Sequence, residues 1–149
     1  MKGYWNKKEE SEKALKGGWM HTGDAGRMDE EGFVFIQDRI KDMIVSGGEN
    51  IYSTEVEAAL FAHPDVVDAA VIGVPDEKYG EVVKACIVKK EGSNVTEADL
   101  ISFCKDRIAS YKKPQSVDFI DEVPRNASGK VLKKVLREPY WKDQERQVS

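Results

Sequence analysis

Short apolar runs separated by turn residues dominate the first fifty positions of the chain. Strand-like runs occur at residues 19–22, 33–36 and 43–45. The first two flank Asp29-Glu30-Glu31-Gly32, which is typical of a hairpin turn. The third leads into Ser46-Gly47-Gly48, where two adjacent glycines allow the backbone to turn sharply.

Two stretches further along show helical spacing. A helix is expected to begin near Thr54, whose hydroxyl can cap the first turn, with Glu57 completing a capping box. It should end before Pro64, because the residue preceding a proline avoids the α region. Thr96 and Asp99 form a second capping-box pattern ahead of apolar residues at helical intervals, which predicts another helix.

The remaining apolar segments complete an alternating order of strands and helices. Strands are predicted at residues 66–74, 82–88 and 117–120. A last short helix is predicted from the apolar positions of residues 131–136. From residue 43 onward, strands and helices therefore alternate. This order favours an α+β fold, a small mixed sheet with packed helices, preceded by a short β-rich fragment.

Composition narrows the class of protein. The chain has 149 residues, of which 40% are hydrophobic and 34% charged, as in an ordinary globular protein. Its net charge of −4, from 23 basic and 27 acidic residues that are well mixed, argues against a general nucleic-acid binder. No apolar run reaches the roughly 18 residues of a transmembrane segment, and the N-terminus lacks a signal-peptide core. A cytoplasmic protein is expected.

Cysteine and histidine offer no metal or disulfide pattern. Cys86 lies in an apolar strand-like run and Cys104 on the apolar side of a predicted helix, without a short paired spacing. Both are expected to be buried thiols in a reducing compartment. His21 and His63 are too few and too far apart for a metal cluster.

Three segments have compositions that packing alone does not require. They are Thr22-Gly23-Asp24, the charged run 38–42 that leads into 46–51, and Pro124 to Lys130. Taken singly, each has a plain alternative: an ordinary turn, a solvated β-turn and a surface loop. The Gly129-Lys130 pair lacks the Walker pattern, because Val131 follows the lysine and no earlier glycine is in register.

Taken together and in order, these segments resemble a known family. The ordered set comprises residues 19–24, 38–51, Glu55-Val56-Glu57, Val71 to Asp76, and 124–130. It resembles the adenylate-forming superfamily of acyl- and aryl-CoA ligases, adenylation domains and luciferase. The similarity runs from about Gly3 to Leu136, and Lys-Asp-Met-Ile-Val-Ser-Gly-Gly-Glu-Asn-Ile is most like fatty-acyl or aryl-CoA ligases.

The resemblance implies a role for several residues. Asp24 would hydrogen-bond the ribose hydroxyls of ATP or the acyl-adenylate, with Arg39 near the same ribose and phosphate. Lys41 would be the hinge of a mobile domain, and Lys130 the catalytic lysine of adenylation. The loop Ser46, Gly47, Gly48 and Glu49 would face the pantetheine arm of CoA.

The resemblance also implies partners and boundaries. The substrates would be ATP, a carboxylic acid and CoA, with Mg²⁺ held mainly by a large N-terminal domain whose phosphate loop is missing here. Residues 1–40 would be the end of that domain, 41–138 the mobile C-terminal lid and 139–149 a charged tail. Met1 is expected to begin a truncated frame or an expressed fragment that is inactive alone. Uncovered aromatic residues would favour its self-association.

One departure from the family pattern and two alternatives remain. Ser53-Thr54 replaces a proline found in many members, and the expected Thr54 cap would explain how the helix starts without it. The chain could instead be a stand-alone interaction module that keeps the lid fold without catalysis. A weaker alternative is the lid of a peptide-synthetase adenylation domain, although the hinge there is more often Asp than Lys.

Overall fold

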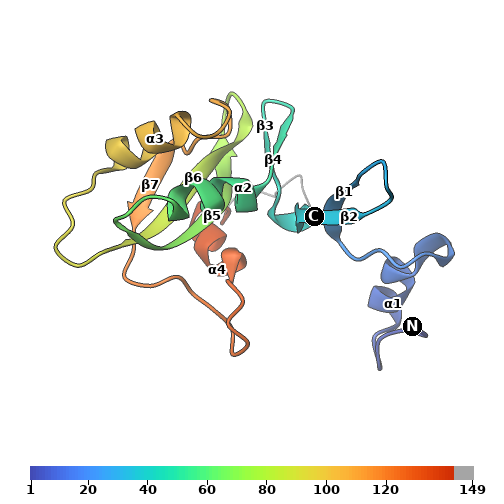
Figure 1. Ribbon diagram of the computed structural model, residues 1–149. Coiled ribbons are helices and arrows are strands. Elements are labelled where there is room, and N and C mark those ends of the chain that lie inside the picture. The colour runs from blue at the N-terminus through green and yellow to red at the C-terminus, as the bar shows by residue number, and fades with distance from the viewer. Residues whose placement is uncertain (143–149) are drawn as a thin grey trace. The chain divides into compact units, whose positions relative to one another are not determined.

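The computed structural model describes residues 1–142 in two compact units, Met1–Ile40 and a second unit that begins at Lys41. The expected charged tail, 139–149, lies outside the described residues from 143 onward. The first unit contains the helix α1 (Lys8–Ala14), the 3-10 turn η1 (Lys16–Gly18), and the strands β1 (Asp24–Met28) and β2 (Val34–Arg39). Figure 1 shows the β1–β2 hairpin in blue.

The hairpin of the first unit forms where a turn was predicted. β1 and β2 pair antiparallel, and the amide of Asp29 donates to the carbonyl of Phe33 at 3.0 Å across the turn. The strand predicted at 19–22 is wrong, since the first strand begins at Asp24. Gly17, Gly18 and Gly23, which flank this segment, all have positive φ, which lies outside the extended region. Trp19 remains 79% exposed.

The second unit is built on a five-stranded sheet. The 3-10 turn η2 (Ile40–Asp42) begins one residue before this unit. The elements that follow in chain order are β3 (Ile44–Ser46), β4 (Glu49–Ile51), α2 (Ser53–Phe61), β5 (Val66–Asp76), β6 (Gly80–Lys89), α3 (Glu97–Lys105), β7 (Ser116–Phe119), α4 (Lys133–Arg137) and η3 (Glu138–Tyr140). The strand order is β4-β3-β6-β5, and β7 pairs with β6. Among the described strands of this sheet only the β6–β7 pair is parallel, so the predicted mixed sheet is confirmed.

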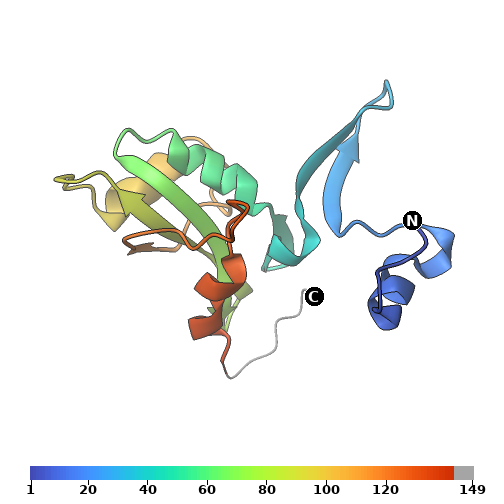
Figure 2. The ribbon, with the colours of Figure 1, turned by 90° about the horizontal axis from the view of Figure 1, so that it is seen from below.

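The sheet is covered on both faces. Alternate residues of β5 and β6 point to opposite sides, as the two-residue period of a strand requires. One set, including Val71, Val83 and Ile87, packs with α2 and α3. The other set, including Ile72 and Val82, packs against Leu136 and Tyr140 at the C-terminal end. Figure 2 shows α2 and α4 on opposite sides of β5.

The two predicted capping boxes had different outcomes. At α3 the box is present: the Asp99 amide donates to Thr96 Oγ1 at 3.3 Å, and the Thr96 amide donates to Asp99 Oδ2 at 2.9 Å. The box at Thr54 is wrong, because α2 starts at Ser53 with no side-chain cap. Glu57 instead accepts from the amide of Val71 and pairs with Lys133.

Candidate functional site

Asp24 and Arg39 come together at the open end of the β1–β2 hairpin. They are partners in the strand register, and Arg39 Nε lies 3.4 Å from Asp24 Oδ1. The Asp24 amide donates to Thr22 Oγ1 at 3.1 Å, which fixes the start of the strand. Both side chains are partly exposed, so their unused donors and acceptors can face a ligand.

Lys41 begins the second unit, and its backbone is held by α4. Its carbonyl accepts a hydrogen bond of 2.9 Å from Arg137 Nη1. The second terminal nitrogen of Arg137 lies 3.0 Å from Asp42 Oδ1. The Lys41 side chain is exposed, whereas its main chain is tied to residues almost a hundred positions away.

The loop Ser46 to Glu49 is the tight turn of the β3–β4 hairpin. Gly47 and Gly48 have φ of 58° and 88°, the left-handed region in which two-residue hairpin turns favour glycine. The Gly47 amide donates to the carbonyl of Tyr79 at 2.9 Å. A β-carbon at position 47 would lie 3.1 Å from the Tyr79 ring, so the close approach of the two segments depends on glycine.

A hollow of about 250 Å³ opens beside this turn. It is lined by Ser46, Gly47, Glu49, Tyr79, Tyr111 and Gln115. Three of the four residues expected to face CoA therefore share one concave surface with two tyrosines. Small residues on one side and aromatic rings on the other suit a narrow, partly apolar chain.

Lys130 ends a structured loop between β7 and α4. Arg125 and Val131 form an antiparallel bridge, and the carbonyl of Lys130 accepts from the Asn126 amide at 2.9 Å. Asn126 Oδ1 in turn accepts from the amides of Ser128 and Lys130. The Lys130 side chain is exposed, and its ammonium has no hydrogen-bond or ion-pair partner among residues 1–142.

Arg125 fixes this loop to the sheet. Its Nη2 pairs with both carboxylate oxygens of Asp68 on β5, at 2.8 and 2.9 Å. Its Nη1 donates to the carbonyl of Gly129 at 3.0 Å, directly before Lys130. One terminal nitrogen of Arg125 thus holds the Asp68 carboxylate and the other holds the loop backbone, so the guanidinium ties the loop to β5.

The start of α4 has a second anchor. Lys133 Nζ lies 2.7 Å from Glu57 Oε1 and 2.5 Å from Ser53 Oγ, so α4 is tied to α2. These side chains are largely buried, with exposures of 10% for Lys133 and 17% for Glu57. The loop that carries Lys130 is thus held on both sides, while the lysine head itself stays in solvent.

Burial and hydrogen bonding shift the pKa values of several groups that are not among the candidate site residues. Burial raises the pKa of Tyr140 to about 12, assisted by its hydrogen bond to Asp118. Burial would also raise the pKa of Asp118, but hydrogen bonds from Lys84 and Tyr140 hold it below its usual value. Burial raises the pKa of both Cys86 and Cys104 to about 11, so these thiols are protonated at neutral pH.

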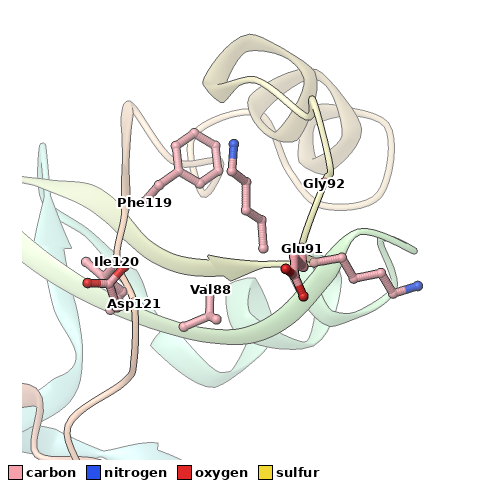
Figure 3. A pocket seen from close by; sticks show the side chains of 8 residues that line it. Val88, Glu91, Gly92, Phe119, Ile120 and Asp121 are labelled. Carbon is pink, nitrogen blue, oxygen red and sulfur yellow. The ribbon is translucent and has the colours of Figure 1, made fainter.

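A second hollow, of about 320 Å³, lies at the far end of β6 and β7. Residues 88–92 and 119–121 line it, and Lys89 Nζ sits 4.8 Å from the centre of the Phe119 ring. Figure 3 shows the Phe119 ring apart from the Glu91 and Asp121 carboxyl groups. Its two lysines and two carboxylates offset each other, and it contains none of the residues singled out by sequence.

The sequence match decides the family. Residues 55–130 match the AMP-binding enzyme C-terminal domain. The chain belongs to this family. The match covers most of α2, the sheet strands β5 to β7, α3 and the loop that ends at Lys130.

Individual relatives of this AMP-binding enzyme domain are ligases. The chain is 47% identical over 146 residues to a fatty acid–[acyl-carrier-protein] ligase, ScoC, of Streptomyces coeruleorubidus, covering 98% of this chain and 28% of that protein. It is 47% identical over 140 residues to the long-chain-fatty-acid–CoA ligase FadD13 of Mycobacterium tuberculosis, covering 94% and 28%. The chain therefore spans less than a third of the length of these relatives.

Solved structures give the same fold. The o-succinylbenzoate–CoA synthetase of Bacillus subtilis, in complex with its acyl-adenylate intermediate, superimposes with a TM-score of 0.85 at 42% identity. The match covers 98% of this chain and 29% of that one. Other structural neighbours hold ATP or AMP. The α+β domain with its small sheet is thus the C-terminal domain of adenylate-forming enzymes.

Several residues of this AMP-binding enzyme domain were not predicted from sequence. Tyr79, Tyr111 and Gln115 line the hollow beside the turn at Gly47. Tyr79 lies in the β5–β6 turn, whereas Tyr111 and Gln115 lie in the connection between α3 and β7. Asp68, the partner of Arg125, lies 57 positions from it in the sequence. Arg137, the partner of Lys41, lies 96 positions from it. No local spacing signals such pairs. The sequence of residues 124–130 showed the motif, but it did not show the contacts of Arg125 and Lys133 that hold the loop in place.

Proposed function

We propose that the chain is the C-terminal domain of an AMP-forming acid–CoA ligase. Such a ligase joins ATP and a carboxylic acid into an acyl-adenylate with release of pyrophosphate, and then transfers the acyl group to CoA with release of AMP. The observation that carries the proposal is Lys130: an exposed ammonium, without a partner among the described residues, on a loop anchored by Arg125 and Lys133.

Lys130 suits the adenylation step. A carboxylate that attacks an α-phosphate meets another anion, and a positioned ammonium between them offsets the repulsion. Unit charges about 4 Å apart interact by about 4 kcal/mol at an effective dielectric of about 20. The lysine would act where charge gathers in the transition state. The contacts of Arg125 and Lys133 already restrict the loop, so less conformational entropy is lost when Lys130 is positioned for the reaction.

The other predicted residues have corresponding roles in the proposal. Asp24, braced by Arg39, would accept hydrogen bonds from the ribose hydroxyls of the nucleotide, and Arg39 would also meet its phosphate. Lys41 would be the joint between the end of a large N-terminal domain, residues 1–40, and the mobile lid, residues 41–138. The turn at Ser46 to Glu49 would face the pantetheine arm of CoA along the hollow with Tyr79 and Tyr111.

Metal and membrane contributions are not assigned to this chain. Among residues 1–142 no group of three or more His, Cys, Asp or Glu side chains could hold a metal ion, so Mg²⁺ is placed on none of its residues. No helix in the described part has the length and apolarity to cross a bilayer. The ammonium of Lys130 is the charge that this domain itself would bring to the phosphate.

The experiment for this proposal combines the chain with an N-terminal portion taken from a relative. The chain is mixed with the N-terminal portion of a relative such as the fatty-acyl–CoA ligase, expressed without its own C-terminal domain. We expect ATP–pyrophosphate exchange that depends on a fatty acid and requires both pieces. Exchange by the N-terminal portion alone, unchanged when the chain is added, would instead favour a stand-alone interaction module.

A second acceptor is supported by one relative. ScoC is a fatty acid–[acyl-carrier-protein] ligase, and the chain is as similar to it as to FadD13. Both acceptors present a phosphopantetheine thiol, which the same hollow would accommodate. Supplying CoA and a holo acyl-carrier protein in separate reactions distinguishes them, and the proposal expects the CoA thioester to form faster.

A further inference from the structure

The backbone around Lys41 is pinned on both sides, once within each unit. In the first unit the Ile40 amide donates to the carbonyl of Gly23 at 2.8 Å. In the second unit the Lys41 carbonyl accepts from Arg137 Nη1 at 2.9 Å. These two bonds fix two peptide planes that are separated by very little chain.

Only four soft torsions lie between the pinned planes. An amide hydrogen moves with the peptide plane before its Cα, and a carbonyl oxygen moves with the plane after its Cα, because each peptide bond is planar. The free torsions are therefore φ and ψ of Ile40 and φ and ψ of Lys41. Asp42, on the far side of the second plane, is held by the same arginine.

Arginine suits this position for a geometric reason. Its planar fork can reach a carbonyl and a carboxylate at once, which the single ammonium of lysine cannot do in a fixed orientation. The Arg137 and Asp42 side chains are only 12% and 15% exposed, so water competes weakly for the contact. Asp42 Oδ1 is buried without a well-aligned hydrogen bond, and the ion pair at 3.0 Å is what offsets its charge.

We propose that Arg137 is a positioning residue that clamps the carbonyl of Lys41 to α4 and confines the joint to Ile40 and Lys41. A swing of the second unit then turns about these two residues and leaves the strand β3 undisturbed. Because α4 directly follows the loop that ends at Lys130, the clamp also links the joint to the element next to that lysine. The link between the joint and Lys130 rests on the proposed function, whereas the contact between Arg137 and the Lys41 carbonyl does not depend on it.

Limited trypsin digestion of the 149-residue chain tests the clamp directly. Trypsin can cut after Arg39 and after Lys41, and the second cut attacks the same carbonyl that Arg137 holds. In Arg137→Met, we expect the ratio of cleavage after Lys41 to cleavage after Arg39, measured by mass spectrometry, to rise about tenfold or more. A hydrogen bond to a charged group is worth at least that factor in a local opening equilibrium.

Lys134→Met is the matched control. It removes a cation and a tryptic site from the same helix, but its exposed side chain does not contact the joint, so the ratio should stay at the wild-type value. Arg137→Lys should give an intermediate ratio, and it replaces Arg137→Met if circular dichroism shows that variant to be unfolded. A folded Arg137 variant with the wild-type ratio, or an equal rise in Lys134→Met, would overturn the clamp. Neither result depends on ATP, so failure of the clamp and failure of the proposed reaction are separable.

Discussion

The anchor between α4 and α2 gives a stability prediction that the structure makes quantitative. Two lysine–glutamate pairs tie the chain to the same helix α2, and both have a nitrogen–oxygen distance of 2.7 Å. The Lys133–Glu57 pair is 10% and 17% exposed. The Lys112–Glu55 pair is 19% and 39% exposed, so solvent screens it more strongly.

Lys133→Met should be much the more costly substitution of the two. Removing one partner of a buried pair leaves an uncompensated charge and costs about 3–5 kcal/mol. Because Glu57 keeps the hydrogen bond from the Val71 amide and some exposure, we expect a value near the lower end, about 3 kcal/mol. Lys112→Met removes a pair that is partly in water and should cost about 1 kcal/mol or less.

Urea denaturation followed by circular dichroism measures both variants. The free energy of unfolding should fall by the stated amounts with an unchanged denaturant slope, which shows that the folded state is preserved. The double variant Lys133→Met with Glu57→Gln should recover part of the loss, since no lone charge then remains buried. Equal losses for Lys133→Met and Lys112→Met would refute the argument from burial.

Three further predictions concern a turn glycine, the two buried cysteines and the carboxylate of Asp118. Gly47→Ala should lower the free energy of unfolding by about 1–2 kcal/mol, because a left-handed φ disfavours a β-carbon; an unchanged denaturation midpoint would contradict this. Cys86 and Cys104, whose pKa values burial raises to about 11, should resist Ellman's reagent at pH 8 and react only after denaturation; rapid labelling of the native chain would contradict it. Asp118 has a lowered pKa when folded, so its stabilisation is present above its unfolded pKa of about 3.9 and lost as the pH falls through the folded value. Acid denaturation of Asp118→Asn should therefore depend less on pH below about 4 than that of the wild type.

The order of elements in the second unit could be predicted from the sequence because apolar periodicity and turn residues are local signals. The strand at 82–88 and the capping box at Thr96 are read from residues that are neighbours in the chain. The ordered motifs also predicted the family, and the match over residues 55–130 confirms it. The fold class was therefore predictable before any coordinates were known.

The errors came where long-range contacts or backbone geometry decide the outcome. Thr54 has the residue type of a cap, but Glu57 is drawn to Lys133 and Val71 instead of back to the helix start. Residues 19–22 have strand composition, yet the glycines around them adopt positive φ and no strand within residues 1–142 pairs with them. The clamp from Arg137 to Lys41 joins residues 96 positions apart, which no sequence period encodes.

The exposed aromatic residues of the first unit remain relevant to the proposed domain organisation. Trp5 is 90% exposed and Trp19 79%, and Phe33 and Val34 on the hairpin are also more than half exposed. Exposed apolar side chains gathered on so small a unit favour association. The prediction that the chain self-associates when it is alone follows from this exposure, and supplying an N-terminal portion should suppress it.

The role of Lys130 is tested most directly by measuring the two half-reactions separately with the complementary N-terminal portion present. In Lys130→Ala, we expect acyl-adenylate formation from ATP and a fatty acid to be abolished. Thioester formation from a supplied acyl-adenylate and CoA should proceed at the rate of the unsubstituted chain. Normal acyl-adenylate formation by Lys130→Ala would contradict the central claim.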